Sequence, residues 1–353
     1  MRVAWMALAP SRRPCQVGLH TNYYEREDAV PQGQSGSKAG SHETGPELTL
    51  AVVGAGAMGG YFAGRIAESG GAVVLVDVDE DRLAAIARDG LRVENDSGDR
   101  RVRMATAKAT DLTDPVDLVI VFTKGMHTRA AVESVRHIVA DHTWFLTLQN
   151  GLGNPELIAS LFPRNPVASG VTDVPSDLAG PAHVRSDRAG SVRLWSADGE
   201  PSAGLEQIRS LLDGAGITCI ADPEIRTAIW EKASFNAALN PLTALTRLPV
   251  GGLDNDDGRA VIGEIVAEAV TAASASGIVV DQARILSKVD HALTYHRTHE
   301  PSMLQDLRAG RQTEIETING AIVRTADANG TPAPVNRAIA RLIRLAQDAS
   351  RRT

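Results

Sequence analysis

The chain has 353 residues, of which 43% are hydrophobic and 22% are charged. This length suits two domains rather than one core, and the composition excludes disordered and fibrous classes of protein. The formal net charge is −7 and no Lys/Arg-rich stripe is present, so we expect no nucleic-acid partner.

The cysteine content and the apolar runs bear on the compartment. Cys15 and Cys219 are the two cysteines, and no CxxC or Cys/His cluster occurs, so neither a disulfide framework nor a zinc site is indicated. No apolar run approaches the roughly 20 residues that span a bilayer, and the apolar part of MRVAWMALAPSRR is short for a signal peptide. We therefore expect a cytoplasmic protein that makes no membrane contact.

Residues 1–46 show neither helical nor strand periodicity and are rich in Gly, Ser, Pro, Arg and Glu. This composition predicts a disordered tail, and an over-called start codon explains it equally well. The first strand-like run, LTLAVVGAG, begins at Leu48. We assign no function to the preceding residues.

From Leu48 onwards, short apolar runs alternate with helical stretches. LTLAVV precedes a helix expected over 57–69, AVVLVD precedes one over 80–88, and DLVIVFT and TWFLTL follow as further strands. Such alternation predicts a parallel sheet with helices on both faces, so residues 47–222 are expected to form an α/β, Rossmann-type, doubly wound domain. LRVENDSGDRRVRM predicts an inserted hairpin, and PAHVRSD and SVRLWSAD predict antiparallel edge strands.

After about Asp222 the strand signals stop, near GITCIADPEIR. Residues 223–353 are therefore expected to form an all-α domain. The helices predicted there cover 223–245, 258–277, 281–294, 314–328 and 333–349.

A glycine-rich motif joins the first strand to the first helix. LTLAVV leads directly into Gly54-Ala55-Gly56-Ala57-Met58-Gly59. Gly54 permits the tight turn, Gly56 lets the backbone approach a pyrophosphate, and Gly59 lets helix and strand pack closely. The helix amino terminus then favours the bound anion. The motif predicts dinucleotide binding, the alternative being a structural turn.

Asp77 ends the second strand, where a carboxylate can accept hydrogen bonds from the ribose hydroxyls of the cofactor. A carboxylate at this position repels the 2'-phosphate of NADP, and Arg82 is the one basic residue of DVDEDR. These residues predict a preference for NADH, unless Asp77 is simply a solvated strand end.

Two further polar residues follow strand ends. Lys124 follows DLVIVFT, and Asn150 lies in Gln-Asn-Gly after TWFLTL. The carboxyl ends of strands line the ligand crevice of a doubly wound sheet, so both residues are candidates for cofactor or substrate contacts. Gln-Asn-Gly is also an ordinary turn signal.

Lys232, Asn236 and Asn240 are spaced four apart within IWEKASFNAALNPLTAL, so on a helix they share one face. Hydride delivered to a ketone leaves negative charge on its oxygen, which an ammonium can stabilise and protonate. With an ordinary pKa near 10.4, Lys232 would be charged at neutral pH. Pro241 is expected to kink this helix. An exposed lysine beside structural asparagines fits the spacing too.

The motifs GAGAMG, QNGLGN, WEKASFNAALNPLTAL and SMLQDLRAGRQTEIETINGAI occur in this order. From residue 48 to about 350 the chain resembles the ketopantoate reductase (2-dehydropantoate 2-reductase) family. The resemblance implies a Rossmann domain, a helical carboxy-terminal domain, and substrate bound between them.

Carried over by motif, Lys232 resembles the general acid of the family, and Asn236 and Asn240 resemble its substrate-binding asparagines. Asn150 resembles an asparagine near nicotinamide and substrate, and Lys124 resembles a lysine near the cofactor.

Two roles rest on the resemblance alone. Ser302 resembles the serine that holds the substrate, and Glu314 resembles the glutamate that orients the lysine and the substrate. Without the resemblance, Ser302 would be interpreted as a helix cap and Glu314 as a solvated acid in a first helical turn.

Two departures from the family pattern bear on specificity. The family norm is NADPH, with a basic residue after the second strand, whereas this chain has an acidic stretch over 77–81. Where the family commonly has GVTTHGA, residues 170–175 are GVTDVP, which places an acid where an anionic substrate would lie.

The expected activity is NAD(P)H-dependent reduction of 2-dehydropantoate to pantoate, as in pantothenate biosynthesis. The alternatives are a reductase of the same family that acts on another 2-oxo acid or ketone, and a non-catalytic dinucleotide sensor. The expected partner is a small-molecule 2-oxo acid, and the sequence allows a monomer or a homodimer.

Overall fold

The central strands of the main sheet are apolar and buried on both faces. The computed structural model describes residues 48–350, so the tail expected over 1–46 lies outside the described residues. Within 48–350 the main sheet has eight strands, in the order β12-β11-β8-β7-β6-β1-β2-β5. Their bounds are β1 Thr49–Val53, β2 Ala72–Val76, β5 Ala105–Ala107, β6 Val116–Val121, β7 Val139–Thr147, β8 Val167–Thr172, β11 Ser191–Ser196 and β12 Thr218–Ala221.

Strand β6 shows why the sheet needs helices on both faces. Successive side chains of a strand point to opposite faces, and the whole of Leu118–Val121 is buried. Leu118 and Ile120 pack with α1 (Ala57–Glu68) and α5 (Ala203–Gly214) in one apolar cluster. Val119 and Val121 pack with α3 (Thr128–Ser134) and α4 (Asn154–Leu161) in another. The predicted doubly wound sheet is confirmed.

The connections place the expected cofactor motif at a reversal of strand order. Strand β1 pairs in parallel with β2 on one side and with β6 on the other. Ligands of open α/β sheets bind outside the carboxyl ends of the strands at such a point. The helix α1 begins there, and α2 (Glu80–Asp89) follows β2.

A second sheet contains the predicted hairpin, with four strands among the described residues in the order β4-β3-β10-β9. β3 (Leu91–Asn95) and β4 (Gly98–Val102) form the hairpin, and β9 (Asp177–Gly180) is antiparallel to β10 (His183–Arg185). PAHVRSD is antiparallel to β9, as predicted, but the predicted edge position is wrong, because β10 lies between β9 and β3 and runs parallel to β3. SVRLWSAD is antiparallel to β8 as predicted, yet β12 pairs beyond it and takes the edge.

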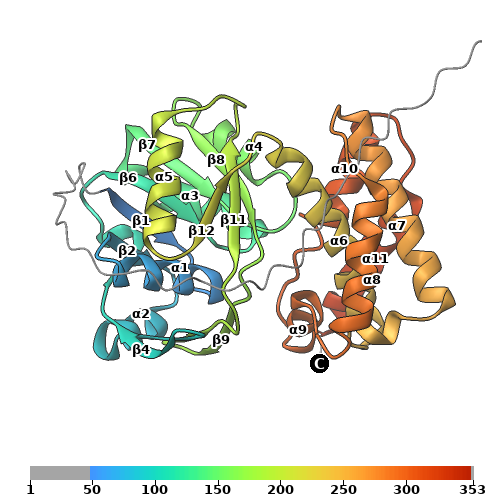
Figure 1. Cartoon of the computed structure of the whole chain (residues 1–353), viewed down its shortest axis with the longest axis horizontal. Coiled ribbons are helices and arrows are strands. Elements are labelled where there is room, and N and C mark those ends of the chain that lie inside the picture. Colours follow the sequence, from blue (N-terminus) through green and yellow to red (C-terminus); the bar gives the residue numbers. More distant parts are fainter. Residues whose placement is uncertain (1–47, 351–353) are drawn as a thin grey trace, which may run out of the picture. The chain divides into compact units, whose positions relative to one another are not determined.

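The chain after Ala221 is helical, as predicted (Figure 1). The helices are α6 Ile225–Thr246, α7 Asp256–Ala275, α8 Gln282–Tyr295, α9 Ser302–Arg308, α10 Asn319–Ala328 and α11 Pro334–Ser350. The short helix α9 has no counterpart in the prediction, and α10 begins five residues later than the helix predicted from 314.

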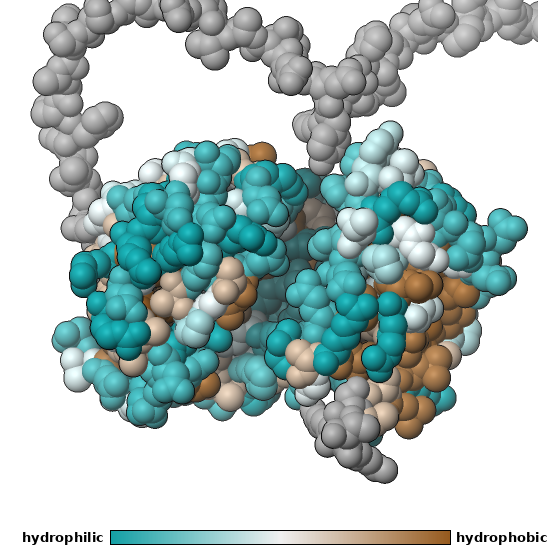
Figure 2. All heavy atoms as spheres, turned by 90° about the horizontal axis from the view of Figure 1, so that it is seen from below, coloured by the Kyte–Doolittle hydropathy of each residue, from teal (hydrophilic) through white to brown (hydrophobic). Residues whose placement is uncertain are grey.

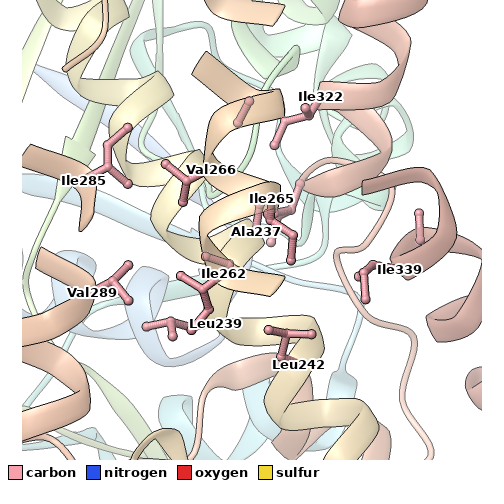
Figure 3. Close-up of a cluster of buried hydrophobic side chains, with 14 of the residues drawn as sticks. Ala237, Leu239, Leu242, Ile262, Ile265, Val266, Ile285, Val289, Ile322 and Ile339 are labelled. Carbon is pink, nitrogen blue, oxygen red and sulfur yellow. The ribbon is translucent and has the colours of Figure 1, made fainter. Parts of the chain in front are cut away.

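One apolar cluster holds the helices together. Ala237, Leu239 and Leu242 of α6 lie with side chains of α7, α8, α10 and α11 (Figure 3). One side of α6 is therefore committed to the core, and its polar residues must lie on another side. None of the helices within 48–350 combines the length and apolarity of a membrane span. The surface drawn in Figure 2 is largely hydrophilic, with some apolar patches.

Candidate functional site

The glycine-rich loop has the close-packed geometry that its sequence predicts. Gly54 has a φ of +107°, a conformation that favours glycine, and its amide donates to the Val76 carbonyl at 2.8 Å. A Cβ on Gly59 would overlap the Gly54 carbonyl oxygen. The loop and the first turn of α1 are therefore held against each other and against the end of β2.

The same loop leaves room for a ligand. A Cβ on Gly56 would meet no described atom within 4 Å, and no side chain caps the amino terminus of α1. Exposed backbone amides at a helix start bind phosphate groups. The residues present therefore fit the pyrophosphate of a dinucleotide.

Asp77 is held beside this loop by backbone amides. Its Oδ2 accepts from the Ala55 amide at 2.5 Å, and its Oδ1 accepts from the amides of Val78 and Asp79 at 2.7 and 2.9 Å. Arg82 donates to the Ala55 carbonyl at 3.2 Å and pairs with Asp79 at 3.4 Å. The carboxylate is thus fixed at the end of β2, next to the glycine-rich loop, and the one basic side chain of this stretch already pairs with Asp79 and the Ala55 carbonyl.

The ends of β6 and β7 are joined by a polar network that the sequence did not predict. The Gln149 side-chain amide donates to the Thr123 carbonyl at 2.6 Å and to the Thr128 hydroxyl at 2.9 Å. This network fixes the two turns that carry the candidates Lys124 and Asn150. The Lys124 ammonium pairs with Asp306 of α9 at 2.5 Å. Its predicted contact with the cofactor stays a prediction.

Lys232 lies on α6 and reaches the end of β8. Its Nζ donates to the Thr172 carbonyl at 2.8 Å. Asn236 and Asn240 follow on the same helix, and their side-chain amides have no hydrogen-bond partner among residues 48–350. Asn240 is 7% exposed. Asn236 is half-buried, and neither amide is among the buried side-chain groups of residues 48–350 that lack a partner, so both stay accessible and can offer hydrogen bonds to a polar ligand.

The rotation of α6 is fixed by a buried acid next to Lys232. Glu231 is 3% exposed, and its carboxylate accepts from the Arg284 Nε at 2.7 Å and pairs with Lys288 at 3.3 Å. Arg284 and Lys288 both lie on α8. The ion pairs and the apolar core hold two sides of α6, which leaves the side of Lys232 for the site.

Pro241 lies inside α6, which continues to Thr246. Proline has no amide hydrogen, so the Ala237 carbonyl loses its usual helical partner. The Asn319 side-chain amide donates to that carbonyl at 3.1 Å. Asn319, the first residue of α10, therefore restores the missing hydrogen bond from outside the helix.

Glu314 is not in a helix, which corrects the prediction of a helix over 314–328. Residues 314–318 form turns, and α10 begins at Asn319. The Glu314 carboxylate accepts from the Gly125 amide at 3.0 Å, and the nearby Asn150 side chain acts to lower its pKa. The Thr317 carbonyl accepts from the Leu152 amide at 2.8 Å. These groups bind the turns after β6 and β7, so the segment cannot continue the helix.

Burial shifts the pKa values of both Glu314 and Lys232. Burial raises the pKa of Glu314, although the Gly125 amide, the Lys124 charge and the Asn150 amide act in the opposite direction. Burial lowers the pKa of Lys232 to about 8, partly offset by the charges of Glu314 and Asp173. The ordinary pKa expected for Lys232 from the sequence is therefore wrong.

The lowered pKa of Lys232 predicts a pH dependence. The proton donor that the sequence predicts at Lys232 would have to be in the ammonium form for reduction, and this form is lost as the pH rises through about 8. The rate of ketone reduction should fall about tenfold per pH unit above that value, while the rate of hydroxy-acid oxidation should rise. Measuring kcat in both directions between pH 6 and 10 checks this. A reduction rate that stays flat to pH 10 would contradict it.

The remaining candidates are Ser302 and the segment 170–175. Ser302 is exposed at the start of α9, and its side chain has no hydrogen-bond partner among residues 48–350. The Asp173 carboxylate accepts from the Ser191 amide at 2.5 Å and lies 3.7 Å from Arg188. The acid of the altered segment is therefore accompanied by a cation, while its charge still acts on Lys232.

The α/β part and the helical part of the chain each match a known protein family model. Residues 50–199 match the family model described as Ketopantoate reductase PanE/ApbA, and residues 224–347 match Ketopantoate reductase PanE/ApbA C terminal. The chain is 32% identical over 298 residues to the 2-dehydropantoate 2-reductase of Streptococcus pyogenes, which is 84% of this chain and 97% of that protein. The chain belongs to the ketopantoate reductase family.

Two solved structures are similar to this ketopantoate reductase family member. One is a ketopantoate reductase from Ralstonia eutropha, with a TM-score of 0.80 and 32% identity over 86% of this chain and all of that one. The other is D-mandelate dehydrogenase with NADH and anilino(oxo)acetate, with a TM-score of 0.82 and 26% identity at the same coverage. The chain is an NAD(P)H-dependent 2-oxo acid reductase of this family.

Proposed function

We propose that this protein reduces 2-dehydropantoate to pantoate, the reaction that serves pantothenate biosynthesis. The observation that carries the proposal is the face of α6, where the Lys232 ammonium lies beside two amides that have no partner among the described residues. The 32% identity to the S. pyogenes 2-dehydropantoate 2-reductase supports the choice of substrate.

In the proposed mechanism, the cofactor, Lys232, Glu314 and the two asparagines of α6 have different roles. Bound NAD(P)H supplies hydride. Lys232 stabilises the negative charge that develops on the ketone oxygen and then protonates it. Glu314 is assigned the orientation of Lys232 and the substrate, and its negative charge supports this because it acts to raise the pKa of the Lys232 ammonium. Asn236 and Asn240 supply hydrogen bonds to the substrate.

Two other residues complete the proposed substrate site. Asn150 follows β7 and acts on the pKa of Glu314, so it would link the cofactor side to the catalytic groups. Ser302 offers a hydroxyl that has no partner among residues 48–350, which leaves it available to a substrate oxygen.

The test of the proposed function is turnover of NADH and NADPH with 2-dehydropantoate. We expect robust oxidation of at least one cofactor. A second candidate, reduction of another 2-oxo acid, is favoured by Asp173 beside Lys232 and by the similarity to D-mandelate dehydrogenase. A panel of aliphatic and aryl 2-oxo acids separates the two. Tight dinucleotide binding without any turnover would instead favour a sensor.

The fixed carboxylate of Asp77 predicts a preference for NADH. It would accept the ribose hydroxyls and repel a 2'-phosphate, and the adjacent Val78 is 94% exposed and carries no charge. We expect kcat/KM to be about tenfold or more higher for NADH than for NADPH, which corresponds to 1.4 kcal/mol of discrimination. Steady-state kinetics with both cofactors measures this ratio.

A pair of variants tests the cause of that preference. Asp77→Asn combined with Val78→Arg should lower the NADH/NADPH ratio, because it removes the repulsive charge and adds a cation. Asp96→Asn, in the exposed turn between β3 and β4, is the matched control and should leave the ratio unchanged. Equal efficiency of the native enzyme with both cofactors would contradict the prediction.

A further inference from the structure

Asp306 is a buried carboxylate that the proposed mechanism does not use. It lies on α9 and is 5% exposed. One of its oxygens is 2.5 Å from the Lys124 Nζ, and the other accepts from the Arg311 Nε at 3.0 Å. A carboxylate this deeply buried is costly without such partners, so its position depends on both cations.

Lys124 pairs with the buried Asp306 and lies near the half-buried Glu314. Its ammonium pairs with Asp306 and donates to the Gln312 carbonyl at 3.3 Å. The amide of the next residue, Gly125, donates to Glu314 at 3.0 Å. The Lys124 charge also acts on Glu314, although no hydrogen bond joins the two side chains among those of residues 48–350. Lys124 is therefore next to Glu314 but is directed to Asp306.

Charges of alternating sign run through the site as a result. Arg311 contacts Asp306, Asp306 contacts Lys124, and the charge of Lys124 acts on Glu314. Glu314 in turn acts on Lys232. Interaction between charges strengthens as their separation falls, so an ammonium released from Asp306 would be drawn to Glu314. There it would compete with Lys232 for the same carboxylate.

We propose that Asp306 is a positioning residue that holds the Lys124 ammonium away from Glu314 and so keeps that carboxylate available to Lys232. The inference rests on the role of Glu314 in the proposed function. It requires no contact between Asp306 and the substrate.

The charged and polar groups around Glu314 determine how its pKa should change in variants. Lys124 and the Gly125 amide come from the turn after β6, Asn150 from the turn after β7, and Lys232 from α6. Asp306 acts on Glu314 from α9 and raises its pKa. Asp306→Asn should therefore lower the pKa of Glu314 for two reasons. It removes a nearby negative charge, and it releases the Lys124 ammonium. Lys124→Met should raise it.

The test is a carboxyl titration of the full chain by NMR, with 13C in the glutamate side chains. Glu314→Gln identifies the Glu314 signal. We expect its midpoint to move down in Asp306→Asn and up in Lys124→Met, each by up to about 1 pH unit. In Lys124→Met the further change Asp306→Asn should have a smaller effect, because only the direct charge effect of Asp306 on Glu314 remains.

Asp254→Asn is the matched control. Asp254 also pairs with two cations in the helical part, Arg259 at 2.8 Å and Arg297 at 2.9 Å. Its replacement by asparagine should leave the titration midpoint of Glu314 unchanged. A midpoint in Asp306→Asn equal to that of the native protein would overturn the inference. If Asp306→Asn does not fold, an unchanged midpoint in Lys124→Met overturns it equally.

A kinetic measurement separates this inference from the proposed substrate. In the native enzyme the acid limb of the pH-rate profile should follow ionisation of Glu314, and Asp306→Asn should move that limb in the same direction as the NMR midpoint. The titration needs no substrate, so absent turnover with 2-dehydropantoate counts against the proposed function alone. Identical acid limbs in the native enzyme and Asp306→Asn, with any 2-oxo acid that is turned over, count against the inference.

Discussion

Replacing Lys232 with alanine should lower kcat for ketone reduction by about 10² to 10⁴. The variant loses both the proton donor and the positive charge beside the developing oxyanion. Binding of the dinucleotide should persist, because Lys232 bonds to the Thr172 carbonyl rather than to the glycine-rich loop. Steady-state kinetics with the preferred 2-oxo acid and fluorescence titration with NADH measure the two effects.

Two further variants separate proton transfer from charge. Lys232→Arg keeps a positive charge but holds its proton at any accessible pH, so it should remain strongly impaired if proton donation is the main contribution. Lys108→Ala removes an exposed lysine that pairs with Glu80 at 2.5 Å and should behave like the native enzyme. A kcat for Lys232→Ala within a few-fold of the native value would exclude Lys232 as the general acid.

Glu314→Gln should lower kcat by about 10², the cost of misplacing a catalytic group by about 1 Å. The neutral amide fills the same space but no longer attracts the Lys232 ammonium, which Glu314 keeps protonated to higher pH. The base limb of the pH-rate profile should therefore move to lower pH. The measurement is kcat against pH for the reduction.

The control for this variant lies two residues away. Glu316→Gln removes a partly exposed carboxylate that accepts from the Arg344 Nε at 2.6 Å, outside the site. It should leave the position of the base limb unchanged. An unshifted base limb in Glu314→Gln, with a normal rate, would show that Lys232 works without its buried partner.

The parts of the fold that follow from local sequence were predictable. The glycine-rich loop and the doubly wound sheet depend on glycine positions and on continuous apolar strands, and both are visible in the chain itself. The position of PAHVRSD was not predictable in this way. Its pairing with β3 joins segments about 90 residues apart, and no local pattern encodes such a contact.

The candidate site also has parts that were predictable from local sequence and parts that were not. The polar face of α6 follows from the spacing of Lys232, Asn236 and Asn240 on one helix. The late start of α10 does not, because hydrogen bonds to Gly125 and Leu152 of the α/β part override the helical pattern of residues 314–318. Asp306 had no signal beyond its place in the SMLQD motif, since its importance comes from a lysine 182 positions earlier in the chain.

The hydrogen bond from Asn319 to the Ala237 carbonyl has a consequence for how the enzyme prepares for its substrate. It ties the start of α10 to the helix that carries Lys232, and Glu314 lies just five positions before Asn319. The proposed proton donor and the carboxylate that acts on it thus lie on segments that this hydrogen bond joins in the folded chain. The two groups should therefore rearrange little when the proton is transferred. Binding energy from the parts of the substrate that are remote from the reacting carbonyl is then left for aligning the ketone with the nicotinamide.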